Sequence, residues 1–192
     1  INTDKPTRWV LKCPQHLEQL TVLQKVFPDA TVAITHRDPV AVIQSAITIM
    51  AYGQRLSRKQ VMTEQLAAYW IDRVDHLLRA CMQDRDCLPA EQSIDIKFKD
   101  LIQNDVASVE KIYQRAGLPM TALAEQQLSE FVEQHKEDYG RIIYDLEGQF
   151  GVNSDTLRKQ FDYLCSAYLD ETHSSPPFPL RSTLLHLSLL AQ

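Results

Sequence analysis

The sequence has few glycines for its length, and none of them forms a phosphate-binding loop. Five glycines occur in 192 residues, and no G-x-x-x-x-G-K-[ST] motif is present. Loops of that kind bind phosphate with successive backbone N–H groups, and they need glycine where a side chain would block the approach. The lack of this motif, and of a carboxylate motif for Mg²⁺, argues against a kinase-like phosphotransferase.

The sequence also has only four cysteines, and its net charge is negative. None of the four cysteines stands in the C-x-x-C spacing typical of zinc sites, and nothing indicates a disulfide framework. We therefore expect no metal, reduced and mostly buried thiols, and a cytoplasmic location. The net charge of −5 argues against a nucleic-acid binder. It is compatible with a small anionic ligand held by one or two arginines.

Long hydrophobic runs are absent as well. No apolar segment is long enough to span a bilayer and no signal peptide is recognisable, so we expect no membrane partner. With 192 residues, of which 44% are hydrophobic, the chain can form one sizeable core. It begins with Ile1 and enters a predicted strand almost at once, which suggests a fragment or a processed product.

The pattern of apolar residues predicts alternating strands and helices. Runs of β-branched or alternating apolar residues predict strands, and apolar residues at intervals of three and four predict helices. Two strands joined by a helix form a right-handed parallel crossover, and ligands bind beyond the carboxyl ends of such strands. Strands are expected at residues 8–13, 31–36 and 94–98, and helices at 15–27, 40–50, 57–84, 105–116, 121–136 and 155–168.

The end of the chain differs in character from the rest. The segment SSPPFPL cannot continue a helix, and the final STLLHLSLLAQ is apolar but too short to cross a membrane. This end is either a peptide that docks on a partner or an unstructured terminus, and we favour the second. The expected organisation is one domain at residues 1–169 followed by a disordered tail at 170–192.

Residues 31–45 indicate an anion site built from a strand, a turn and a helix. Asp38 is a good N-cap residue, and Pro39 suits the first helical position. Arg37 therefore stands beside a helix N-terminus, whose dipole favours an anion. Ser45 lies eight residues after Arg37, so a guanidinium and a hydroxyl can converge on one phosphate. The alternative is that Arg37 pairs with a surface carboxylate and Ser45 only packs.

The residues before this site extend the pattern. A strand leads into a Lys-x-Pro-x-His turn, the helix that follows ends in Phe-Pro-Asp-Ala, and the next strand leads into the Arg-Asp-Pro helix. This order and spacing resemble the sulfotransferase family, in particular its broad bacterial and tyrosylprotein-type branch. The resemblance is strongest over residues 8–52 and continues to about residue 168. Its motif residues are Lys12, Pro14, His16, residues 27–30, residues 37–39 and Ser45.

The resemblance implies an enzyme that transfers a sulfonate group from 3′-phosphoadenosine 5′-phosphosulfate to a hydroxyl or amine of a small-molecule or peptide acceptor. It also implies an α/β fold of the P-loop NTPase-like type, a three-layer sandwich with a mostly parallel sheet flanked by helices, incomplete in this chain. No metal takes part in this chemistry. Arg37 and Ser45 match the pair that binds the 3′-phosphate of the donor in this family.

Two residues after the first strand are candidates for catalysis. Lys12 matches a lysine that lies near the transferred group in the family, where it would stabilise the bridging oxygen or the sulfonate; the alternative is a solvated lysine. His16 opens the first helix, and an imidazole with an ordinary pKa near ~6.5 suits a general base; the alternative is a capping or surface residue. His36 is expected to point away from Arg37 and to be structural.

Two later segments match the family in part. Phe98 stands where the family has a tyrosine, so it can stack on adenine but cannot form a hydroxyl hydrogen bond. Gly140, Arg141 and Tyr144 match a basic loop that closes over the nucleotide, although Ile142 replaces the second histidine of that loop.

The family's loop for the 5′-phosphosulfate, a turn rich in Gly, Ser and Thr after a first strand, has no counterpart in the sequence. We therefore expect the chain as given to be inactive in sulfonate transfer, with an exposed sheet edge or apolar surface that favours a homo-oligomer. The main alternative is a non-catalytic module that binds a nucleotide or another anion. A kinase-like phosphotransferase is the second alternative.

Overall fold

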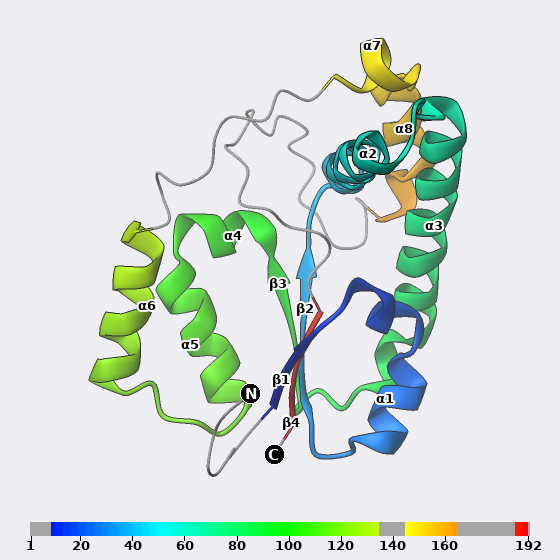
Figure 1. The fold of residues 1–192 in the computed structure, drawn as a ribbon. Helices are drawn as coiled ribbons and strands as arrows, with labels where there is room; N and C mark the ends of the chain where they lie inside the picture. The colour runs from blue at the N-terminus through cyan, green and yellow to red at the C-terminus, as the bar shows by residue number, and fades with distance from the viewer. Residues whose placement is uncertain (1–8, 135–144, 165–186, 192) are drawn as a thin grey trace.

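A four-stranded sheet lies at the centre of the computed structural model, which describes residues 9–134, 145–164 and 187–191 (Figure 1). Its strand order is β1-β4-β2-β3. β2 pairs with β3 in parallel, whereas β4 pairs antiparallel with both β1 and β2. β1, β2 and β3 therefore run in the same direction, as predicted. The strands are β1 (Trp9–Lys12), β2 (Thr31–His36), β3 (Ser93–Lys97) and β4 (Leu187–Ala191).

Helices cover both faces of the sheet, which gives an α/β fold with parallel strands flanked by helices (Figure 1). One side carries the 3-10 helix η1 (Pro14–Glu18), α1 (Leu20–Val26) and α3 (Thr63–Asp84). The other side carries α4 (Phe98–Gln103), α5 (Asp105–Arg115) and α6 (Ala122–Gln134). The other described helices are α2 (Pro39–Ser57), η2 (Arg85–Cys87), α7 (Leu146–Phe150) and α8 (Ser154–Gln160). Of the helices in the described ranges, none is long and apolar enough to cross a membrane.

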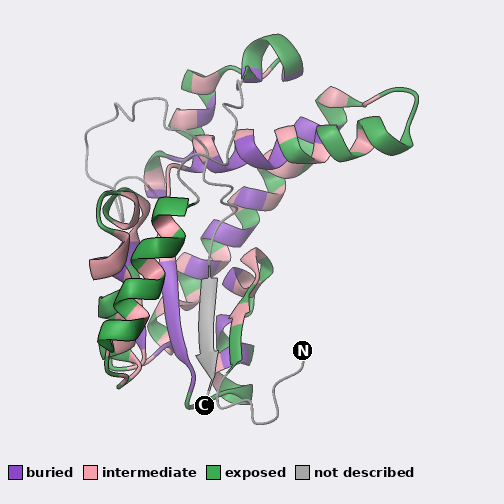
Figure 2. Cartoon of the chain, turned by 60° about the vertical axis from the view of Figure 1, so that its left-hand side comes forward, coloured by how far each residue is buried: buried purple, intermediate pink, exposed green. Residues whose placement is uncertain are grey.

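The hydrophobic core lies between the sheet and the helices α1, α2 and α3. Val32 and Ile34 of β2 are buried against Leu20 of α1 and the inner side of α3. Buried residues, drawn in purple in Figure 2, run along the central strand and the inner surfaces of these helices. Each large apolar side chain buried in this way contributes about 1.5–3 kcal/mol. The core therefore fixes the position of β2, whose carboxyl end carries Arg37.

α2 begins as the sequence predicts, but it is longer than predicted. The side chain of Asp38 accepts a hydrogen bond from the N–H of Val40 at 3.0 Å, and Pro39 occupies the first turn. Ile43 and Ile47 are fully buried. No proline interrupts the helix after residue 50, so it continues to Ser57.

Two other predicted helices have different bounds. The helix expected at residues 15–27 is divided into η1 and α1, because Gln19 has a φ of −130° and lies outside the helical region. The helix expected at residues 57–84 begins only at Thr63, because Ser57 ends α2 and residues 58–62 connect the two helices. Phe98, expected to end the third strand, is instead the first residue of α4.

Helix α6 contributes no buried residue to the core, although the helical spacing of its apolar residues predicts an inward-facing side made of Leu123, Leu128, Phe131 and Val132. No residue of α6 is buried, and Leu123 and Phe131 are 63% and 57% exposed. That expectation is wrong because α6 packs against α5 at the outside of the layer and never reaches the sheet (Figure 1). The helical spacing of apolar residues also predicts that Tyr69 lies on the buried face of α3, but its side chain is 59% exposed.

The end of the chain takes part in the sheet. Residues 187–191 form β4, with Leu189 opposite both Leu11 and Val32. Five residues of the segment that we expected to be a disordered tail therefore form a strand, and the backbone hydrogen bonds of this strand join β1 to β2. Residues 170–186 lie outside the described part of the chain.

Candidate functional site

The carboxyl ends of the three parallel strands lie at one edge of the sheet, where the sequence predicted a ligand. Lys12 is the last residue of β1, Arg37 directly follows β2, and Phe98 directly follows β3. Strand direction therefore brings these three predicted residues to the same edge, although they come from distant parts of the chain.

Lys12 and Arg37 share this edge but are not side by side. Lys12 and Ala33 both stand opposite Ser188 of β4, so Lys12 is level with Ala33, which is four residues before Arg37. Across the sheet, Lys12 and Arg37 are separated by two interstrand spacings of about 5 Å each, and along the strands by four residues of about 3.3 Å each. Their Cα atoms are therefore roughly 16 Å apart. A ligand that contacts both side chains must be elongated, as a nucleotide with phosphate groups at two positions is.

Arg37 is held against an aromatic ring. Its guanidinium carbon lies 4.7 Å from the centre of the Phe98 ring, a cation–π geometry. Phe98 takes this position because α4 starts immediately at the end of β3. The contact orients the guanidinium at the edge of the sheet, where it can bind an anion with two parallel N–H groups.

Ser45 is the second predicted ligand of the anion, and its hydroxyl has no partner. The residue is 0% exposed, and its Oγ forms no hydrogen bond. Thr48, one turn further along α2, instead donates to the carbonyl oxygen of Gln44 at 2.7 Å. A buried hydroxyl without a partner is unfavourable by about 1–3 kcal/mol, so Ser45 is poised to bond an incoming group. Contact with a ligand requires the groups that cover Ser45 to move.

The N-terminus of α2 contributes less to an anion site than the sequence suggested. Pro39 has no N–H, and the N–H of Val40 already donates to the carboxylate of Asp38. That carboxylate also lies 3.5 Å from the guanidinium of Arg158 on α8. The Arg37 side chain must therefore provide most of the attraction for a phosphate.

His16 lies in η1, two residues after Pro14, and is half-buried. Its Nδ1 atom is buried and has no hydrogen-bond partner. Burial lowers the pKa of His16, which favours the neutral imidazole that a general base requires. Partial burial also lowers the pKa of Lys12, against a smaller opposing effect of Cys13.

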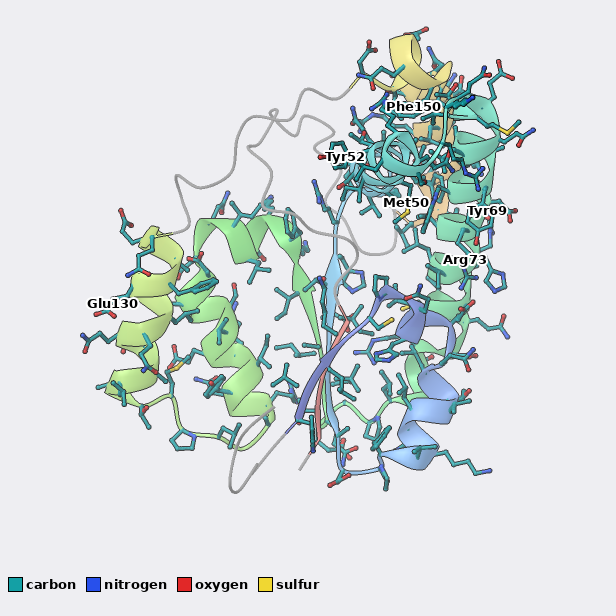
Figure 3. All side chains as sticks on the ribbon, in the orientation of Figure 1. Met50, Tyr52, Tyr69, Arg73, Glu130 and Phe150 are labelled. Carbon is teal, nitrogen blue, oxygen red and sulfur yellow. The ribbon has the colours of Figure 1, made fainter. Side chains whose placement is uncertain are left out.

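The segment that carries His16 is clamped to α3 by an ion pair that sequence reasoning missed. Arg73, midway along α3 (Figure 3), donates two hydrogen bonds to Glu18, one of them at 2.8 Å. His76 lies 3.2 Å from the same carboxylate. The hydrogen bonds from Arg73 lower the pKa of Glu18. No local signal predicts this pair, because its members are 55 residues apart.

His36 is structural, as expected from its position on the strand. Its Nε2 atom lies 2.6 Å from Oδ1 of Asp95 on the neighbouring strand β3. Arg85 of η2 donates to the same carboxylate at 2.5 and 3.1 Å. Burial alone would raise the pKa of Asp95, but the hydrogen bonds from His36 and Arg85 outweigh it and hold the pKa at about 2.

We expect Asp95→Asn to lower the free energy of unfolding at pH 7 by about 1–2 kcal/mol, because the amide cannot pair with both neighbours. The value is modest because the carboxylate is 35% exposed and water screens it. The folded pKa is below the unfolded value, so this contribution is complete above about pH 4 and is lost as the pH falls towards 2. Urea unfolding of the wild-type chain and the variant at pH 7 and near pH 2 measures the difference in the free energy of unfolding. Asp86→Asn, at an exposed position, is the control.

Three residues that match the family's basic loop and one cysteine lie outside the described part of the chain, namely Gly140, Arg141, Tyr144 and Cys165. Among the described residues, no group of three His, Cys, Asp or Glu side chains could hold a metal ion. The described cysteines are free thiols. Cys81 is the buried one, and burial raises its pKa to about 12.

Comparison with known proteins places this chain in a family. The sequence profile of the sulfotransferase family matches residues 1–122, well over half of the chain and all the described site residues. The protein belongs to the sulfotransferase family. No curated protein sequence gives a significant match.

Two solved structures have a similar fold. Sulfotransferase STF9 from Mycobacterium avium is 21% identical with a TM-score of 0.70, over 85% of this chain and 42% of STF9. Sulfotransferase STF1 from Mycobacterium tuberculosis is 23% identical with a TM-score of 0.62, over 78% of this chain and 38% of STF1. The chain thus spans less than half the length of either relative. The likeness shows a shared α/β fold.

Proposed function

We propose that this chain supplies the 3′-phosphate side of a sulfotransferase site whose donor is 3′-phosphoadenosine 5′-phosphosulfate. One observation carries the proposal. Arg37 is held against Phe98 at the carboxyl edge of the sheet, and the unpartnered hydroxyl of Ser45 follows on the helix that starts beside it. A guanidinium and a hydroxyl are suitable donors for the oxygens of one phosphate.

The donor supplies an activated sulfonate group, and residues at the edge of the sheet assist its transfer. Lys12 stabilises the charge that grows on the bridging oxygen as the bond between sulfur and that oxygen breaks. His16 accepts the proton of the acceptor hydroxyl or amine while the acceptor atom bonds to sulfur. The sulfonated acceptor and adenosine 3′,5′-bisphosphate are the products. The lowered pKa of His16 keeps the imidazole available as a base near neutral pH.

The proposal also concerns the fold type and the part of the whole protein that binds the other end of the donor. Three strands in one direction with helices on both faces are compatible with a P-loop NTPase-like sandwich. We propose that the donor's 5′ side is bound by a glycine-rich loop elsewhere in the whole protein, since none of the five glycines of this chain forms one. The aromatic ring of Phe98 would contact adenine on the face that Arg37 does not cover.

Selectivity for the 3′-phosphate tests the proposed function. Adenosine 3′,5′-bisphosphate is expected to bind the chain at least tenfold more tightly than adenosine 5′-monophosphate, because only the bisphosphate reaches Arg37 and Ser45. Isothermal titration calorimetry of both nucleotides at one salt concentration measures the ratio. Equal affinities would contradict the proposed role of this edge.

A non-catalytic anion-binding module is the rival function, favoured by the missing glycine-rich loop. Both functions predict binding of the bisphosphate. Protein expressed from the full open reading frame separates them, since only a sulfotransferase transfers labelled sulfonate to a mixed panel of phenols, alcohols and amines. Binding without transfer in that protein would favour the module.

A further inference from the structure

An open groove lies between the last turns of α2 and the first turns of α3, away from the edge that carries Arg37. Its volume is about 350 Å³, within the range of small-molecule sites. Met50 of α2 and Tyr69 of α3 lie at this end of the two helices (Figure 3). From Ser45 to Gln54, another lining residue, is nine residues of helix, or about 13 Å. The groove is therefore separate from the proposed phosphate site.

The walls of the groove suit a flat apolar group. Leu66 is buried and Trp70 is half-buried, and Met50 and Met62 also belong to the apolar part of the lining. The rings of Tyr69 and Trp70 meet at 90° with their centres 5.5 Å apart. Two perpendicular rings form a corner in which an aromatic ligand can stack on one ring and meet the edge of the other.

The groove also has two polar features that call for a ligand of a particular kind. The Oε1 atom of Gln54 is buried and has no hydrogen-bond partner, so it needs an N–H or O–H donor. Arg58 stands at the exposed rim, close in sequence to Arg55 and Lys59. No aspartate or glutamate is among the described residues that line the groove. The rim therefore attracts an anion.

We propose that this groove binds an anionic amphiphile, a molecule with a flat apolar body, a hydrogen-bond donor and an acidic group. The body packs against Trp70 and Tyr69, the donor bonds Gln54, and the acidic group pairs with Arg58. This site uses none of the residues assigned to the sulfonate donor, so it goes beyond the proposed function and stands if that function fails.

A matched pair of fluorescent probes tests the proposal. The charged probe is the isomer of anilinonaphthalene sulfonate whose N–H and sulfonate lie at opposite ends of the naphthalene, and the uncharged probe is the same molecule without the sulfonate. The chain has two tryptophans, so a Trp9→Phe background leaves Trp70 as the sole tryptophan, whose emission is excited selectively. We expect saturable binding of the charged probe with quenching of Trp70 emission.

Two arginine variants with the same change in net charge identify the site. Arg58→Gln is expected to weaken the charged probe about tenfold and to change the uncharged probe less than twofold, since one charge-assisted bond is lost. Arg55→Gln, on the same exposed helix end but outside the groove, should change neither probe more than twofold. Gln54→Met should weaken both probes, because both carry the N–H.

Each contrary result overturns the proposal. Equal weakening by Arg58→Gln and Arg55→Gln would show general attraction to positive charge. Binding without quenching of Trp70 emission would show that the probe binds elsewhere on the chain. The absence of saturable binding would show that the groove does not bind the probe. Displacement of the probe by adenosine 3′,5′-bisphosphate would show that the two sites are not separate, whereas failure of the nucleotide to bind would contradict only the proposed function.

Discussion

Arg37→Ala is expected to weaken binding of adenosine 3′,5′-bisphosphate by about 10- to 150-fold, or about 1.5–3 kcal/mol. The physical reason is the loss of a charge-assisted, bidentate interaction with the 3′-phosphate at a place where the helix N-terminus offers few free N–H groups. Isothermal titration calorimetry of the wild-type chain and the variant measures the change.

Three comparisons make this result specific. Arg55→Ala removes the same charge from the exposed last turn of α2 and should leave affinity within about twofold of wild type. Arg37→Lys keeps the charge but loses the planar fork, so its affinity should fall between those of wild type and alanine. Thermal unfolding of each variant shows whether loss of the contact with Phe98 alters the fold. Equal affinities of wild type and Arg37→Ala would remove Arg37 from the site.

Lys12→Ala is expected to lower turnover by about 10²–10³-fold in protein from the full open reading frame. Lys12 stands at the other end of the proposed site, roughly 16 Å from Arg37 by strand geometry. We propose that it contacts the leaving oxygen there and not the 3′-phosphate. Its interaction grows as charge develops in the transition state, so kcat falls while affinity for adenosine 3′,5′-bisphosphate stays within about twofold. Steady-state kinetics with labelled donor and calorimetry with the product measure the two quantities.

A matched lysine tests whether the effect depends on position. Lys25, in the exposed last turn of α1, carries the same charge away from the edge of the sheet, and Lys25→Ala should leave turnover unchanged. A Lys12→Ala enzyme whose kcat and nucleotide affinity fall together would show that Lys12 contributes ground-state binding. An enzyme with unchanged turnover would leave Lys12 as a solvated residue at the end of a strand.

The sequence by itself determined the local parts of the site. The apolar, β-branched run of β2 predicted the bounds Thr31–His36 correctly, and Asp38 with Pro39 predicted where α2 begins. These features depend on contacts within a few residues, which strand propensity and helix capping describe well. The resemblance to the family at Lys12, His16, Arg37 and Ser45 could also be recognised from the sequence, because it depends only on the order and spacing of residues.

Only the tertiary structure decided which distant residues meet. Arg37 lies on Phe98, and Glu18 pairs with Arg73, although each pair is separated by more than fifty residues. The placement of β4 between β1 and β2 sets the distance from Lys12 to Arg37. The groove between α2 and α3 exists because α2 continues to Ser57 before the chain turns back. Pairings of this kind are selected by packing and hydrogen bonding over the whole chain, which periodicity within a short window does not report.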